Sequence, residues 1–354
     1  MKHVKIDKEV NFMKNIMLGK TNIIVPQNGF GALPIQRVDI PTATKILQKA
    51  YEGGMRFFDT ARHYTDSEIK LGQAFENIKR DEIIIATKTM GRTPEAFWND
   101  LNISLNNLKT EYIDLYQFHM VNQVYKPNDG TGMYECMLEA KEKGFIKHIG
   151  ITTHKLQVAF EAIESGLYET LQFPFSYLSS DKEIELVNKC KEANMGFIAM
   201  KGLAGGLITH SKACMAFMSQ FDHVIPIWGI QKEKELDEWL SYMENTPSLN
   251  DEMIEFIKKE QEELAHDFCR GCGYCMPCPM GIKINSCARM SLMLRRAPSK
   301  KWLSEEWQEE MNKINTCLEC NACSSKCPYE LNTPELLKKN LIDYQNVLKG
   351  IHKV

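Results

Sequence analysis

Eight of the twelve cysteines form two short motifs near the end of the chain. The first motif is Cys269-x2-Cys272-x2-Cys275-x2-Cys278-Pro279, and the second is Cys317-x2-Cys320-x2-Cys323-x3-Cys327-Pro328. Three thiolates at successive gaps of two residues, followed by a Cys-Pro pair, are typical of proteins that bind [4Fe–4S] clusters. Zinc sites instead use separated Cys-x2-Cys pairs. The spacing therefore favours two [4Fe–4S] clusters over zinc.

The fourth cysteine of each motif is expected to serve the other cluster. The second motif has the spacing of bacterial ferredoxins, whereas the first has one residue fewer before its last cysteine. We expect one cluster on Cys269, Cys272, Cys275 and Cys327, and the other on Cys317, Cys320, Cys323 and Cys278. The short spacing leaves this crossover open, although the set of eight ligands hardly depends on it. The ninth cysteine of this region, Cys287, is expected to be a buried helix residue.

A second set of reactive side chains follows three consecutive β-rich runs. Asp59, Lys88 and His119 each end such a run, and Tyr64 follows the first. A phenol has a pKa near ~10, and a buried ammonium beside it favours the phenolate and lowers that pKa. A carboxylate keeps the ammonium charged, and a neutral imidazole can orient a carbonyl by hydrogen bonding. This set predicts an acid that protonates a carbonyl oxygen while hydride reaches the adjacent carbon.

The elements that must position these side chains alternate between strands and helices. Short apolar, β-branched runs recur eight times, separated by helical segments that several glycines end. This alternation predicts a (β/α)8 TIM barrel, in which the carboxyl ends of the strands carry the chemistry. A preceding hairpin over 16–26 is expected to close the barrel floor. The expected strands are 28–32, 57–60, 83–88, 113–119, 148–153, 170–175, 196–203 and 224–230.

The composition changes near residues 246–268, where strand patterning ends and the cysteines begin. We therefore predict two domains, a barrel over 15–245 and a cluster domain over 250–354. The stretch between the two cysteine motifs is longer than in a compact ferredoxin and has helical periodicity. A mainly α-helical ferredoxin-like domain is expected there.

The barrel region resembles the aldo-keto reductase family. The resemblance rests on GMRFFDTARHYTDSEIKLG (54–72), ATKT (86–89), YQFH (116–119) and KHIGITT (147–153), and it extends over about 15–245. It implies Tyr64 as general acid, Lys88 as the residue that tunes its pKa, Asp59 as the partner of Lys88, and His119 as the group that orients the carbonyl. The implied reaction is reduction of a small aldehyde or ketone by NAD(P)H.

The same resemblance implies where the nicotinamide cofactor binds. Thr152, Thr153 and Gln172 stand where the family has polar side chains for the carboxamide, and Met200 and Lys201 replace a common aromatic residue and serine. The phosphates are implied near Gly229, Gln231 and Lys232, and Trp239 stands in place of an asparagine that contacts adenine. GFGALP (29–34) lacks the third glycine of a dinucleotide fingerprint and is interpreted as a turn. The choice between NAD and NADP stays open.

Composition excludes several other classes of protein. The 354 residues include 44% hydrophobic and 25% charged residues, with a formal charge of −3, which argues against a nucleic-acid binder. No apolar run reaches the ~18–20 residues of a membrane helix, and no signal peptide is apparent, so a cytoplasmic protein is expected.

The clusters suggest a one-electron protein partner such as a ferredoxin or flavodoxin. The alternative to an NAD(P)H-linked reductase is an electron-transfer protein or a subunit of a redox complex that uses the clusters. Its barrel would then be a scaffold or a flavin-linked reductase.

Overall fold

The computed structural model describes residues 11–264, 268–296 and 299–353. The chain divides into two compact units. The first contains the described residues up to Gly202 together with Ser211–Met253, and the second contains Leu203–His210 and the residues from Ile254 onward. The segment Leu203–His210, which lies inside the barrel range expected from the sequence, thus groups with the second unit. Residues 265–267, 297–298 and 354 of the expected cluster domain lie outside the described residues.

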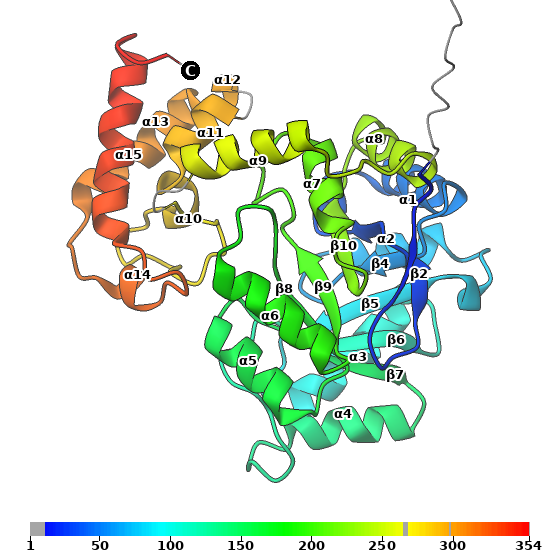
Figure 1. Ribbon diagram of the computed structural model, residues 1–354. Coiled ribbons are helices and arrows are strands. Elements are labelled where there is room, and N and C mark those ends of the chain that lie inside the picture. The colour runs from blue at the N-terminus through cyan, green and yellow to red at the C-terminus, as the bar shows by residue number, and fades with distance from the viewer. Residues whose placement is uncertain (1–10, 265–267, 297–298, 354) are drawn as a thin grey trace, which may run out of the picture. The chain divides into compact units, whose positions relative to one another are not determined.

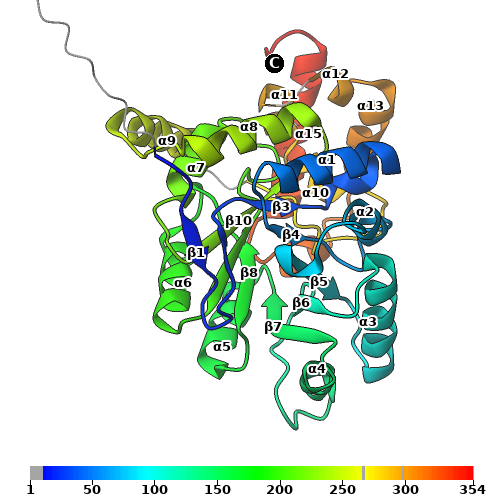
Figure 2. The same cartoon turned by 90° about the vertical axis from the view of Figure 1, so that its right-hand side faces the viewer.

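The first unit is a closed barrel of eight parallel strands (Figures 1 and 2). Neighbouring strands in the chain are hydrogen-bonded, and β10 closes the barrel by pairing with β3. The expected (β/α)8 fold is confirmed. The barrel strands are β3 (Gly29–Gly31), β4 (Phe57–Asp59), β5 (Ile84–Thr89), β6 (Ile113–Phe118), β7 (Ile146–Thr152), β8 (Thr170–Pro174), β9 (Gly196–Met200) and β10 (Val224–Gly229).

Helices follow the strands in alternation, and local capping sets several of their starts. Asp39 accepts a hydrogen bond from the Thr42 N–H at the start of the first helix, and Ser180 forms a capping box with Glu183. The helices are α1 (Ile40–Glu52), α2 (Ser67–Ala74), α3 (Pro94–Leu108), α4 (Met133–Glu142), α5 (Leu156–Ser165), α6 (Asp181–Glu192), α7 (Ser211–Met218) and α8 (Glu233–Glu244), with short 3-10 helices at Pro34–Arg37 and Arg80–Glu82.

The expected hairpin is present as β1 (Asn15–Met17) and β2 (Ile24–Pro26), which pair antiparallel. Its apolar side chains Ile16 and Val25 are buried in one cluster with Phe57, Ile198 and Ile225 from the barrel strands. The hairpin therefore covers one end of the barrel, as predicted, and the reactive residues gather at the carboxyl ends of the strands.

The second unit is helical, as expected. It includes α10 (Ile284–Cys287), α11 (Met290–Arg296), α12 (Ser299–Trp302), α13 (Glu305–Asn312), α14 (Ala322–Ser325) and α15 (Thr333–Leu348), with a 3-10 helix at Lys313–Thr316, and α9 (Asp251–Glu263) precedes them. Cys287, Met290, Met311 and Tyr344 form part of its buried core. None of the described helices is both long and apolar enough to cross a membrane.

Candidate active site and metal centres

Strand β4 and strand β5 bring a carboxylate and an ammonium into direct contact. Asp59 is the last residue of β4 and Lys88 lies one residue before the end of β5. The Lys88 Nζ donates to both carboxylate oxygens of Asp59 at 2.7 Å and to the Thr60 carbonyl at 2.6 Å. Both side chains are almost fully buried, with exposed fractions of 1% for Lys88 and 3% for Asp59. Adjacent parallel strands thus hold a rigid ion pair at one end of the barrel.

Tyr64 and His119 lie against this ion pair. The Lys88 Nζ lies 5.3 Å from the centre of the Tyr64 ring. The Tyr64 and His119 rings are 5.6 Å apart between their centres and nearly perpendicular, at 80°. Tyr64 is half-buried in the loop between β4 and α2, and His119 is buried directly after β6. The structure therefore brings together all four residues that the sequence placed in one catalytic set.

Burial dominates the electrostatics of the ion pair and of the phenol. It raises the pKa of Asp59 and lowers the pKa of Lys88, while their mutual attraction opposes both shifts. Burial and the Asp59 carboxylate also raise the pKa of the Tyr64 phenol above its ordinary value. The expectation that Lys88 lowers the Tyr64 pKa is therefore wrong for this structure. The physical reason is that burial disfavours the phenolate, and the negative charge of Asp59 disfavours it further.

His119 is neutral at physiological pH. Burial holds the pKa of its imidazole well below the ordinary value, and the nearby side chains Lys88, His63 and Arg92 lower it further. A neutral imidazole has one N–H that can donate to a carbonyl oxygen. The site thus combines a protonated phenol with a neutral imidazole, both able to donate a hydrogen bond to one oxygen.

Sequence reasoning missed two residues beside this site. His154 is buried, and the pKa of its imidazole is lowered by burial, by Lys201 and by His119, which places these three groups near one another. It follows Thr152 and Thr153 at the end of β7, and its position after a fourth consecutive strand was an available signal. Arg92 donates from Nη2 to the His119 carbonyl at 2.6 Å, and no local pattern in the sequence indicates that contact.

The residues expected to bind the nicotinamide carboxamide are buried and already hydrogen-bonded. Thr152 Oγ1 accepts from the Met120 N–H at 2.8 Å, and Thr153 Oγ1 donates to the Val121 carbonyl at 2.9 Å. Gln172 Oε1 accepts from Gln117 Nε2 at 3.0 Å. These contacts hold the chain that follows His119 and cross-link β6 to β8. Met200 and Lys201, at the end of β9, are half-buried, and Lys201 has a left-handed backbone with φ of 59°.

The region expected to hold the cofactor phosphates contains an acidic side chain. Gly229 is exposed, and the backbone N–H groups of Gln231 and Lys232 donate to Glu235 Oε2 at 3.0 and 3.1 Å. A carboxylate therefore already caps the start of α8, where helix N–H groups would otherwise attract an anion. The polar groups around Tyr64 and His119 fit the reactive end of a nicotinamide cofactor, whereas the start of α8 fits a phosphate less well.

Trp239 also differs from the role that its position implies. Its indole is 3% exposed and stacks on Trp228, with ring centres 3.9 Å apart and an angle of 8° between the planes. Trp239 thus packs as a core residue of the first unit.

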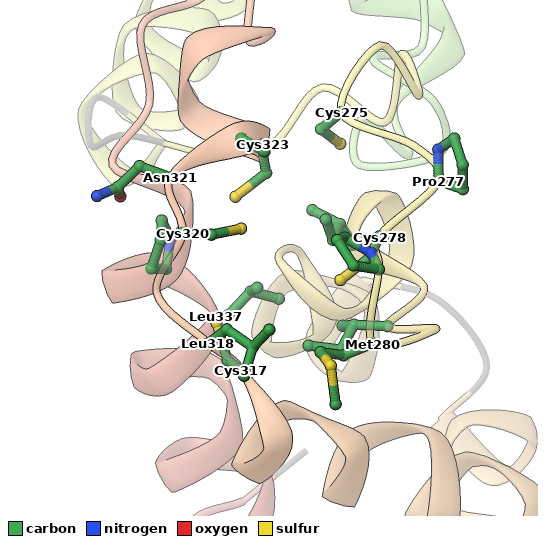
Figure 3. A pocket seen from close by; sticks show the side chains of 15 residues that line it. Cys275, Pro277, Cys278, Met280, Cys317, Leu318, Cys320, Asn321, Cys323 and Leu337 are labelled. Carbon is green, nitrogen blue, oxygen red and sulfur yellow. The ribbon is translucent and has the colours of Figure 1, made fainter.

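The cysteine motifs line two cavities in the second unit. Cys269, Cys272, Cys275 and Cys327 line the first. Cys275, Cys278, Cys317, Cys320 and Cys323 line the second, where Cys320 and Cys323 face Cys275 and Cys278 (Figure 3).

The arrangement of the thiols around the two cavities suits a cluster in each. Within 11–264, 268–296 and 299–353, no three His, Cys, Asp or Glu side chains lie close enough together to ligate a single metal ion. The thiols therefore surround a space that a multi-iron group fits better than zinc.

The two motifs share one backbone conformation, although only one of them uses glycine. The residues on either side of the second cysteine have positive φ in both motifs. They are Gly271 and Gly273, at 67° and 85°, around Cys272, and Glu319 and Asn321, at 51° and 55°, around Cys320. A non-glycine residue adopts this conformation at a cost of roughly 1–2 kcal/mol. The two motifs thus have left-handed backbone at the same two positions, in the second of them without glycine.

Comparisons with known proteins agree with both halves of the chain. The family model described as "Aldo/keto reductase family" matches residues 27–224. The model described as "4Fe-4S dicluster domain" matches residues 268–332.

Curated relatives and solved structures match the barrel. A probable aldo-keto reductase from Glycine max is 26% identical over 212 residues, which are 54% of this chain and 60% of that protein. The NADH-specific methylglyoxal reductase of Escherichia coli is 25% identical over 56% of this chain and 69% of that protein. The chain thus spans about two thirds or less of such relatives. The holo aldo-keto reductase of Bacillus halodurans has a TM-score of 0.62 at 23% identity, covering 70% of this chain and 96% of that one. The Klebsiella pneumoniae aldo-keto reductase in complex with NADPH has a TM-score of 0.58 at 19% identity, covering 71% and 96%.

Proposed function

Because this chain belongs to the aldo-keto reductase family, we propose that its barrel reduces a small aldehyde or ketone with NADH or NADPH. The reduced nicotinamide supplies the hydride. Tyr64 donates the proton to the carbonyl oxygen, and the neutral His119 orients that oxygen by hydrogen bonding. Lys88, held by Asp59, fixes the position of the Tyr64 ring. Lys201 adds a positive charge at the end of β9, suited to an acidic substrate or a cofactor phosphate.

One observation carries this proposal. The Lys88 ammonium, bound by both Asp59 oxygens at 2.7 Å, lies 5.3 Å from the centre of the Tyr64 ring, and the His119 ring lies 5.6 Å from the same ring. Each of these residue types has ordinary structural uses in isolation. A buried ion pair beside a protonated phenol and a neutral imidazole is a complete proton-donating site.

The test is a Tyr64→Phe variant assayed with NADH and NADPH on a panel of aldehydes and ketones. Loss of the proton donor is expected to lower kcat/KM by about 10²-fold or more, since general acids contribute that much. Tyr51→Phe is the matched control, because the hydroxyl of Tyr51, on α1, bonds to the Glu82 carboxylate and its ring packs against Arg56, outside the set of reactive residues. Equal carbonyl turnover in wild type and Tyr64→Phe overturns the proposal.

We also propose two [4Fe–4S] clusters in the second unit. Cys269, Cys272, Cys275 and Cys327 would hold the first, and Cys317, Cys320, Cys323 and Cys278 the second. Support comes from the cavity linings, which group the thiols in these two sets with Cys275 on the shared wall. Anaerobic purification is expected to yield about eight iron and eight sulfide per chain, as two cubanes require. A content near four, or stoichiometric zinc, contradicts this.

A one-electron carrier protein is the proposed partner of the clusters. Cys320 is the exposed cysteine of the second motif, and Leu318 beside it is 65% exposed. Residues 268–354 contain 13 Lys and Arg against 8 Asp and Glu, which suits an acidic carrier. Reduction of the clusters by such a ferredoxin or flavodoxin is expected to slow as salt rises.

The second candidate function is electron transfer with the barrel as a scaffold. The stacked Trp228 and Trp239 and the Glu235 cap favour it, because they occupy the region expected for adenine and phosphates. Tyr64→Phe separates the two functions. An electron-transfer protein keeps full activity with its carrier in this variant, whereas a reductase loses carbonyl turnover.

A further inference from the structure

A buried arginine in the second unit has no carboxylate partner. Arg289, immediately before α11, is 8% exposed. Its Nη2 donates to the Gly205 carbonyl at 2.6 Å and to the Met293 sulfur at 3.3 Å. Its Nε has no hydrogen-bond partner, and no acidic side chain in the described part of the chain pairs with it. A buried guanidinium is costly unless an anion lies nearby.

The guanidinium lies against the first cysteine motif. A Cβ atom on Gly271, between Cys269 and Cys272, would be only 2.4 Å from Arg289 Nη1, and one on Gly205 would be 2.8 Å from it. Two glycines therefore leave the space that the guanidinium fills, one of them inside the motif itself.

A cluster in the first cavity would supply the missing anion. A [4Fe–4S]²⁺ core with four thiolates carries a total charge of −2, and one-electron reduction changes this to −3. No bond is broken and no proton moves in that step, and the electron comes from an external one-electron reductant. Since arginine keeps its proton in proteins, its positive charge stabilises the reduced state more than the oxidised state.

We propose that Arg289 raises the reduction potential of the cluster in the first cavity above that of the cluster in the second. This inference rests on the proposed binding of two clusters. Apart from its cysteines, the second cavity has no ionisable lining residue among those described, whereas Arg270 lines the first cavity, with its guanidinium 4.2 Å from the centre of the Tyr329 ring, and adds to the positive charge of Arg289 there. The nearby Lys338 pairs with Glu319 at 2.6 Å on the surface. An electron that enters at the exposed Cys320 side therefore settles on the first cluster.

The test is an anaerobic redox titration with dithionite, followed by EPR. Arg289→Gln is expected to lower one of the two midpoint potentials, with at least a tenfold fall in that reduction equilibrium, or about 59 mV. Arg289→Lys retains the positive charge and is expected to retain most of the increase in reduction potential that Arg289 causes. Arg295→Gln is the matched control, because Arg295 pairs with Asp343 near the surface. It is expected to leave both potentials unchanged.

A second pair of variants leaves the arginine in place. Met293→Glu puts a carboxylate beside the guanidinium and is expected to lower the same potential, whereas Met293→Gln has nearly the same shape without the charge and is not. If Arg289→Gln binds both clusters and their potentials are unchanged, the role of Arg289 is overturned but the cluster binding is not. If Arg289→Gln does not assemble its clusters, unchanged potentials in Met293→Glu overturn that role instead. Wild-type protein without clusters overturns the proposed cluster binding as well.

Discussion

Removing the Asp59 charge is expected to destabilise the barrel strongly. In Asp59→Asn, the Lys88 ammonium stays buried, with an exposed fraction of 1%, and keeps its hydrogen bond to the Thr60 carbonyl. It loses its counterion, however. Breaking a buried ion pair in this way costs about 3–5 kcal/mol. That is a large part of the ~5–15 kcal/mol by which proteins are stable. The assay is urea unfolding at pH 7 followed by far-UV circular dichroism.

Two further variants make this prediction specific. Asp237→Asn breaks an exposed pair with Lys49 on the surface and is expected to cost less than about 1 kcal/mol. The double variant Asp59→Leu/Lys88→Met removes both charges and is expected to regain most of the stability, although not the activity. A loss below about 1 kcal/mol in Asp59→Asn refutes the reasoning. So does a double variant at least as unstable as the single one.

Three other predictions concern charge and ligation. Glu235→Gln keeps the cap of α8 but removes its charge, so the KM for both NADH and NADPH should fall about fivefold, corresponding to about 1 kcal/mol of repulsion; unchanged KM values for both cofactors in steady-state kinetics contradict the placement of the phosphates. Although burial opposes it, hydrogen bonding from His148 and Lys141 lowers the pKa of Glu169 to about 2. A lowered carboxyl pKa stabilises the fold above the unfolded value near 4.5, and this is lost as pH falls from there toward 2. The difference in the free energy of unfolding between wild type and Glu169→Gln should therefore shrink by about 1–2 kcal/mol over this pH range in an acid titration. This magnitude allows for solvent screening. Cys287→Ala should retain all iron, because Cys287 lines neither cavity, whereas Cys323→Ala should lose about four iron per chain, those of the second cluster.

Local patterns were sufficient to predict the barrel and the positions of its reactive side chains. Each strand is a short apolar run, and a residue at the carboxyl end of such a run must lie at one end of a parallel barrel. Asp59, Lys88 and His119 were therefore placed correctly without any knowledge of distant contacts. The cysteine motifs were equally informative, because their spacing encodes the turn that brings three thiols together.

Contacts between distant segments were beyond the reach of these patterns. Thr152 and Thr153 were expected to face a cofactor, but they bond to the chain after β6, about 30 residues away in sequence. Arg289 bonds to Gly205 across 84 residues, and nothing in the sequence around either residue indicates that contact. Position along a strand predicts where a side chain lies, whereas its hydrogen-bond partner depends on the packing of other elements.

The charges of Lys88 and Arg289 show why the same residue class acts differently in the two units. Lys88 meets two Asp59 oxygens at 2.7 Å, so the pair acts on Tyr64 as a dipole whose field weakens quickly with distance. Burial then determines the Tyr64 pKa, contrary to the expectation from the residue types alone. Among the residues that the structure describes, Arg289 donates to a carbonyl and a sulfur and to no carboxylate, so its full charge remains to act on a nearby cluster. A buried cation therefore influences its surroundings according to its counterion, and the counterion is visible only in the folded structure.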